Sequence, residues 1–307
     1  MSTQVSSPSQ NIPVGLAWMV VSGLCFVTVS AIVRSLGSDM SAPQASFLRY
    51  MFGLMVFLPF LFRIRHRFRL DATMGLFAMR GFVHSVAIIG WFYAMARIPV
   101  SEVTALTFIQ PLFTTLGAAL FFSEKLRAHR MAALAVGFLG MLVIVRPGFQ
   151  EISLGTLAQL AAGPLFAASF LFTKRLTQTE DSLVIVAMLS VFCTIGLIPG
   201  AILNWRTPTM DELFWLFLVA MLATAGHFML TQAFRNAPIS VVQPLNFLQL
   251  VWAALLDVTI FQQAIDPYVI AGGAIIIFSV SYITHREHRA ARRLREAPSE
   301  PPASGGI

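Results

Sequence analysis

The stretches RIPVSEVTALTFIQ at residues 97–110 and NAPISVVQPLNFLQ at residues 236–249 are similar at an offset of 139 residues. The match continues as far as Phe122 in the first copy and Phe261 in the second. A second match, near the start of each half, has an offset of 140. Its pairs are Gly15 with Gly155, Gly23 with Gly163, Phe26 with Phe166, Arg34 with Lys174, and Leu36 with Leu176. The sequence therefore predicts two homologous halves.

The composition is that of a membrane protein. Hydrophobic residues make up 57% of the 307 residues and charged residues 11%, whereas soluble domains have roughly 45–50% and about 25%. The apolar residues form runs long enough to cross a bilayer. The net charge of +7 comes from basic residues in short loops and in the tail at residues 285–296. This distribution fits membrane topology better than nucleic-acid binding.

Apolar runs bounded by Pro, Gly or charged residues predict ten membrane-spanning helices. The runs are too long and too uniformly apolar to be the strands of a barrel. The predicted spans are residues 14–34, 44–62, 74–96, 101–122, 131–146, 154–174, 182–202, 211–234, 240–261 and 267–285. We therefore predict an all-α integral membrane protein with ten transmembrane helices.

The basic residues predict the orientation of these helices. With a cytoplasmic N-terminus, 15 of the 21 Lys and Arg residues fall in cytoplasmic loops or in the C-terminal tail, and four fall in outside loops. The positive-inside rule then places both termini in the cytoplasm. Residues 1–13 are expected to form a cytoplasmic N-terminal tail, and residues 286–307 a basic, disordered cytoplasmic tail.

An odd number of helices in each half determines how the halves are related. Five helices bring the second copy into the bilayer from the other side, so residues 14–147 and 154–285 are predicted to be inverted repeats. Inverted repeats are typical of carriers that work by alternating access, with a substrate site near the bilayer midplane. Duplication for stability alone is the alternative, because channels and scaffolding membrane proteins also contain such repeats.

Several motifs carry a family resemblance. The stretches PQASFLRY, WFYAMARIPVSEVTAL and QAFRNAPISVVQPLNFLQLVWAALL resemble the drug/metabolite transporter superfamily, EamA type, and the resemblance covers residues 14–285. It implies a secondary carrier of the bacterial inner membrane. It also implies that four helices of each half surround a central pathway and that the fifth lies outside it.

The same resemblance narrows the expected substrate. FLRY, YAMARIP, ATAGHFMLTQAF and QPLNFLQLVWA are similar to alphaproteobacterial carriers that include riboflavin importers, so vitamin uptake such as riboflavin is expected. Export of amino acids or other metabolites is the alternative. Small multidrug antiporters of the superfamily carry a glutamate in the middle of the first helix, and this chain has none there. Exchange of protons for cationic drugs is correspondingly disfavoured.

Two arginines, Arg49 and Arg80, fall within predicted spans. A charge there costs roughly 2.5–3.5 kcal/mol on insertion scales, so it should face a partner or a wet cavity. Arg80, His84 and Trp91 share one helix face and predict a wall for a planar, partly polar ligand. Alternatively, the arginines snorkel, His84 bonds a neighbouring helix and Trp91 is an interfacial anchor.

The fourth and ninth spans each carry a polar stripe. Thr107 and Gln110 lie on the first stripe, and Asn246 and Gln249 lie on the second. Because the glutamine is kept in both halves, on helices expected beside the pathway, we predict that these residues contact the substrate. The alternative is hydrogen bonding between helices, worth about 0.6 kcal/mol on average.

Two titratable residues are candidates for proton coupling. Asp257 lies within the ninth span, where the related position of the first half is Ala118. A lone buried acid can couple transport to protons, or it can pair statically with an arginine. His227 lies on one face of the eighth span with Thr224. It titrates near neutrality and could couple protons, bind substrate or make a structural hydrogen bond.

Nothing in the sequence predicts catalysis or a bound group. It has no G-x-x-x-x-G-K-S/T loop and no His/Cys set with metal-ligand spacing. We therefore expect no catalytic residues, no cofactor, no metal and no ATP-driven pump. The expected partners are a small-molecule substrate and the lipid bilayer, without nucleic acid, and a homodimer is left open.

Overall fold

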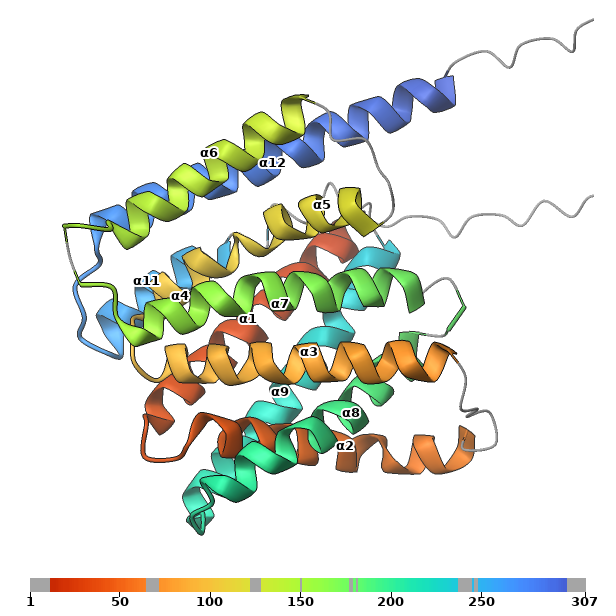
Figure 1. Ribbon diagram of the computed structural model, residues 1–307, viewed down its shortest axis with the longest axis vertical. Coiled ribbons are helices and arrows are strands. Elements are labelled where there is room, and N and C mark those ends of the chain that lie inside the picture. The colour runs from red at the N-terminus through yellow and green to blue at the C-terminus, as the bar shows by residue number, and fades with distance from the viewer. Residues whose placement is uncertain are drawn as a thin grey trace, which may run out of the picture.

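The computed structural model describes residues 12–64, 72–121, 128–149, 151–176, 179–180, 182–236, 245 and 248–296, and its elements are helices (Figure 1). The first half contains α1 (Ile12–Leu36), α2 (Ala42–Ile64), α3 (Ala72–Met95), α4 (Val100–Thr107), α5 (Gln110–Phe121) and α6 (Ala128–Val145). The second half contains α7 (Leu154–Leu176), α8 (Ser182–Leu203), α9 (Met210–Asn236), α11 (Leu248–Thr259) and α12 (Pro267–Glu296). The predicted all-α class is confirmed for these residues.

Five of the described helices are long and apolar enough to cross a bilayer. The five segments are Ile12–Leu36, Ala72–Met95, Leu154–Thr173, Leu183–Leu203 and Met210–Leu230. Large apolar side chains cover the outside of the bundle, and Phe82, Phe170 and Phe228 are each more than half exposed. Soluble proteins rarely expose so much apolar surface, whereas a helix in lipid must do so. The chain is a multi-pass membrane protein.

The fourth predicted span, residues 101–122, is not one helix. A turn at Phe108 and Ile109 separates α4 from α5, and both N–H groups donate to the carbonyl oxygen three residues earlier, at 3.2 Å. Such bonds wind the chain more tightly than an α-helix. Pro111 follows the turn and has no N–H to donate back to it. The predicted span of residues 101–122 is therefore not one helix but two, with Pro111 just after the break.

Helices of the two halves pack against one another throughout the bundle. The most extensive contacts join α1 with α9, α3 with α7, α6 with α12 and α2 with α8. Figure 1 shows α6 and α12 side by side along one edge of the molecule. Where they cross, a Cβ atom on Gly140 would lie 2.8 Å from the carbonyl oxygen of Gly272. The two backbones therefore meet at a distance that only glycine allows.

Contacts between loops hold together the end of the bundle that faces away from the start of α1 and the end of α12. We call it the opposite end. In the α8–α9 loop, Arg206 Nε donates to the carbonyl oxygen of Asp39 at 2.9 Å. The hydrogen bonds of Arg206 to the Glu212 carboxylate raise the pKa of its guanidinium. An ion pair between Arg146 and Asp266 joins the α6–α7 loop to the α11–α12 loop.

Candidate functional site

Four basic side chains from three helices lie near one another: Arg80 is buried, Arg49 and His84 are partly buried, and His227 is exposed. Arg49 is on α2, Arg80 and His84 are on α3, and His227 is on α9. The other three residues all lie close enough to His84 to act on it electrostatically. Arg80 and His84 are four residues apart, so they lie one above the other on the same face of α3. We call these four residues the central basic cluster.

Both arginines of the cluster keep unused hydrogen-bond donors. Arg80 is 7% exposed, and its Nη1 donates to the carbonyl oxygen of Ile185 on α8 at 2.9 Å. The Arg49 guanidinium stacks on the ring of Tyr50, 4.3 Å from its centroid. Arg80 Nε and Arg49 Nη1 are buried and have no acceptor in the described part of the chain. Because an unpaired buried donor costs free energy, both atoms mark a place for acceptors from a ligand.

Aromatic rings surround the cluster. His84 lies edge-on to Tyr50 and to Phe166 of α7, with centroid separations of 6.0 and 5.1 Å. Its Nδ1 is 3.1 Å from the hydroxyl oxygen of Ser169. His227 lies edge-on to Phe26 of α1, at 5.0 Å. Flat rings next to guanidinium groups suit a planar ligand with polar edges.

The two phenylalanines are repeat-related, since Phe26 and Phe166 match at the offset of 140. Phe26 packs on the histidine of α9, and Phe166 packs on the histidine of α3. Each half therefore supplies one phenylalanine and one histidine, and each pair joins the two halves. The cluster lies at the contact between the halves.

The described carboxylates inside the bundle are held away from the cluster. Glu102 of α4 accepts a hydrogen bond from the Thr156 hydroxyl at 2.9 Å. Asp257 of α11 is 1% exposed and accepts the backbone N–H groups of Val100 and Ser101, at 2.9 and 2.8 Å. Both carboxylates act electrostatically on Arg34 of α1.

The position of Asp257 explains how α4 begins. Pro99 precedes α4 and makes no side-chain hydrogen bond to it, so the first N–H groups of the helix need an acceptor from elsewhere. Asp257 supplies that acceptor and places a negative charge at the positive end of the helix dipole. This is a structural role for the buried acid, and proton coupling by Asp257 stays a prediction.

The residues of the two polar stripes make contacts other than those of the central basic cluster. Thr107 accepts a hydrogen bond from Nε2 of Gln159 on α7 at 2.9 Å. Gln110 is half-buried at the start of α5, after the turn that interrupts the predicted stripe. Gln249 of α11 packs beside Gly23 of α1, and Asn246 lies outside the described residues. Contact of these residues with a substrate stays a prediction.

Trp91 lies two turns beyond His84 on α3. It is partly buried, contacts the large apolar core, and meets Phe92 edge-on at 5.3 Å. The sequence reasoning missed Tyr50, Phe166 and Ser169. Tyr50 directly follows Arg49 and Phe166 repeats Phe26, so both left a signal in the sequence, whereas Ser169 left none.

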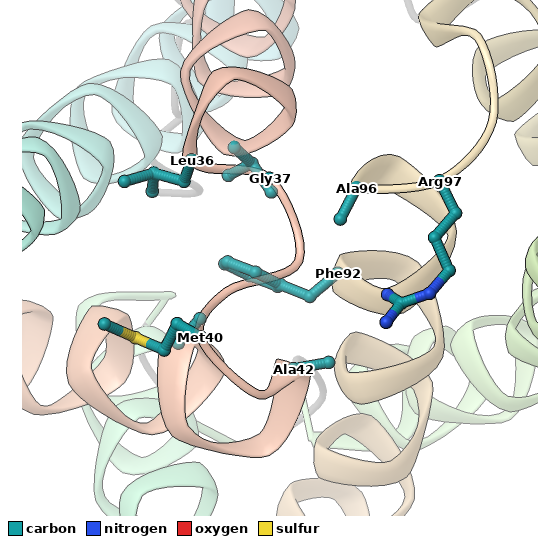
Figure 2. Close-up of a pocket in the computed structure, with 9 residues that line it drawn as sticks. Leu36, Gly37, Met40, Ala42, Phe92, Ala96 and Arg97 are labelled. Carbon is teal, nitrogen blue, oxygen red and sulfur yellow. The ribbon is translucent and has the colours of Figure 1, made fainter. Parts of the chain in front are cut away.

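A surface pocket lies elsewhere, at the opposite end between α1, α2 and α3 (Figure 2). Its lining is mostly apolar and includes Met40 and Phe92. Arg97 is the charged residue of the lining, and its guanidinium stacks on Tyr93, 3.7 Å from the ring centroid. Because the lining is mostly apolar and its one charged residue, Arg97, already stacks on Tyr93, we do not assign this pocket as the substrate site. The described residues contain no group of three His, Cys, Asp or Glu suited to a metal ion.

Comparisons with known proteins agree with this architecture. The model of the EamA-like transporter family matches residues 13–146 and again residues 153–284. A riboflavin transporter of Rhizobium johnstonii is 30% identical, over 93% of this chain and 95% of the relative. A riboflavin transporter of Vibrio cholerae is 27% identical, over 92% and 96%.

Two further similarities extend the comparison. An S-adenosylmethionine uptake transporter of Rickettsia bellii is 25% identical, over 90% of this chain and 95% of the relative. A protein of known crystal structure shares the fold at 17% identity with a TM-score of 0.54, over 91% of this chain and 98% of its own.

Proposed function

The chain belongs to the EamA-like transporter family, and from this premise we propose that it is a secondary carrier. It moves a small organic metabolite across the inner membrane by alternating access, with both termini in the cytoplasm. The observation that carries this proposal is the central basic cluster, which lies between the halves and keeps unused donors inside a membrane protein.

The packing of the helices supports two inverted repeats of five spans, over residues 14–147 and 154–285. Exchanging the two halves turns the contact of α1 with α9 into that of α7 with α3, and the contact of α3 with α8 into that of α9 with α2. The helices α4 and α5 together count as one span of the first half, and α11 belongs to the matching span of the second half. The edge position of α6 and α12 suits helices outside a central pathway.

The contacts at the opposite end support alternating access. Arg34 of α1 donates to the carbonyl oxygens of Met95 and Ile98 and, at 3.1 Å, to Oε1 of Gln263. These bonds join α1 to the end of α3, to the α3–α4 loop and to the α11–α12 loop. A substrate can pass this end only after these hydrogen bonds break, so we assign the described conformation as closed at this end.

Riboflavin is the specific substrate we propose. Its ring system is planar and carries acceptor oxygen and nitrogen atoms along one edge. The rings of Tyr50, His84 and Phe166 suit the plane, and the unused donors of Arg49 and Arg80 suit the acceptors. Relatives named as riboflavin transporters support the same substrate.

Uptake in a bacterial host that can neither make nor import riboflavin tests the proposal. The wild-type chain should restore uptake of labelled riboflavin, and Arg49→Gln should reduce it about tenfold, the equivalent of about 1.4 kcal/mol of lost binding. Arg97→Gln is the matched control, because that guanidinium lies on Tyr93, away from the cluster. The proposal fails if purified chain in liposomes moves no member of a labelled vitamin and metabolite panel in either direction.

A further inference from the structure

The central basic cluster carries positive charge that the described residues do not neutralise. Arg49 and Arg80 are permanently charged. The groups that act electrostatically on Arg80 are Tyr50 and Cys193, neither of which is a carboxylate. Its hydrogen bond goes to a backbone carbonyl group. Arg49 stacks on Tyr50.

Three described arginines at the opposite end of the bundle have acidic groups beside them. Arg146 is paired with Asp266, and Arg206 with Glu212. Arg34 is acted on by both Asp257 and Glu102. These carboxylates lie beside arginines at the opposite end, and none of the described interactions places a carboxylate beside Arg49 or Arg80.

Both arginines of the cluster also have a buried donor atom without a partner, and so does the acid-paired Arg146 at its Nε. Arg80 Nε and Arg49 Nη1 are buried without an acceptor, although their residues come from neighbouring helices and both lie near His84. Unpaired donors of buried guanidinium groups are strong binding sites for carboxylate, phosphate or carbonyl oxygens. A cation at the same place would meet two fixed positive charges in a medium that screens them weakly.

We propose that the central basic cluster is a charge filter. It binds substrates that present an anionic or acceptor-rich group to Arg49 and Arg80, and it rejects substrates that carry a sulfonium or ammonium charge without a compensating anion beside it. The inference rests on the proposed function for the position of the pathway, but it does not depend on riboflavin as the substrate.

Two matched ligand pairs test the filter by equilibrium dialysis against the purified, full-length chain in detergent. Riboflavin and its 5′-phosphate differ by a dianionic group. S-adenosylhomocysteine and S-adenosylmethionine differ by one methyl group and one positive charge on sulfur. We expect the phosphate to bind severalfold more tightly than riboflavin, and S-adenosylhomocysteine to bind at least about tenfold more tightly than S-adenosylmethionine.

Variants then assign the discrimination to the cluster. Arg49→Gln should narrow the difference within both pairs severalfold, while Arg49→Lys should keep it because the charge remains. Arg80→Lys tests the same point at the second arginine: the charge remains, so the difference should also remain. Lysine is used there because Arg80 also donates to the carbonyl oxygen of Ile185. Arg97→Gln should leave all four affinities unchanged.

The possible results separate the two proposals. If S-adenosylmethionine binds as tightly as S-adenosylhomocysteine, or if neither pair shows a difference because nothing binds, the charge filter is wrong. If the discrimination is present but riboflavin does not cross a liposome membrane, the riboflavin assignment is wrong and the filter stands. If riboflavin is transported and S-adenosylmethionine competes equally with S-adenosylhomocysteine, the transporter stands and the filter falls.

Discussion

At the scale of single residues, Asp257 and Arg49 show two different uses of a buried charge. Asp257 is fully bonded by the N–H groups that begin α4, so its charge is satisfied within the protein. Arg49 has a buried donor without an acceptor, so its charge is available to a ligand. A satisfied group points to stability, and an unsatisfied group points to binding.

Substitution of Asp257 separates stability from coupling. Asp257→Asn keeps the shape but removes the charge and weakens the cap, so we expect a loss of about 1–2 kcal/mol of stability. Asp257→Ala leaves two buried N–H groups unpaired and should cost more, at about 1–3 kcal/mol for each group. The measurement is the thermal unfolding midpoint in detergent. A proton-coupling role would give the reverse pattern, with an unchanged midpoint and loss of gradient-driven uptake in Asp257→Asn.

The repeat-related phenylalanines offer a second test at this scale. Phe26→Leu and Phe166→Leu remove one ring each from beside His227 and His84. Edge-to-face pairs contribute about 0.5–1.5 kcal/mol beyond area burial, so each variant should weaken substrate affinity a few fold. Phe170→Leu is the control, because Phe170 is an exposed residue of α7. Equal effects of Phe170→Leu would show that the loss is not specific to the cluster.

At the scale of helices, the sequence predicts spans better than it predicts their interruptions and neighbours. Most predicted spans agree with the described helices, because a run of apolar residues alone marks a helix in lipid. The apolar run by itself does not mark the break after Thr107, since residues on both sides of it are apolar, and the signal near it is Pro111. Helical periodicity placed Arg80 and His84 on one face, but it could not identify α7 and α9 as the helices that meet that face.

The crossing of α6 and α12 gives a prediction at this scale. A Cβ atom on Gly272 would lie 2.5 Å from the carbonyl oxygen of Gly140, so Gly272→Ala must push the helices apart. Overpacking of this kind typically costs about 1–3 kcal/mol. Gly75→Ala in α3 is the matched control, because nothing lies within 4 Å of its added methyl group.

The thermal midpoint distinguishes these two variants. It should fall in Gly272→Ala, and it should stay constant or rise slightly in Gly75→Ala, since alanine is the better helix former by about 1 kcal/mol. An unchanged midpoint in Gly272→Ala would contradict the close backbone contact.

At the scale of the whole molecule, the duplicated sequence predicted the two halves and the site between them. Sequence reasoning placed Arg49, Arg80, His84 and His227 on a pathway from their chemistry alone, and the structure brings these four together. It could not predict that Phe166 and Ser169 meet His84, because those contacts join α3 to α7 of the other half. The stripe residues Gln110 and Gln249 follow the repeat, and their role awaits measurement.

Closure of the opposite end can be tested by cross-linking. Ser41 Oγ lies 3.4 Å from the carbonyl oxygen of Asn204, so a Ser41→Cys/Asn204→Cys pair should form a disulfide in the described conformation. If this end must open in every cycle, oxidation should lower uptake at least about tenfold and a reductant should restore it. Each single cysteine variant is a control for oxidation. Full uptake by completely cross-linked protein would show that this end does not open between these loops.

Asp257, which accepts the first N–H groups of α4, has no acidic counterpart in the first half, where the matching position 118 is an alanine. Two identical halves would make the states open to either side equal in energy, so an unenergised carrier would spend half its time in each. In the proposed alternating-access cycle, we expect the hydrogen bonds of Asp257 to favour the described state, in which α11 meets the start of α4. We therefore expect the empty carrier to prefer the state closed at the opposite end, and we expect reopening of that end to limit the rate of the proposed cycle.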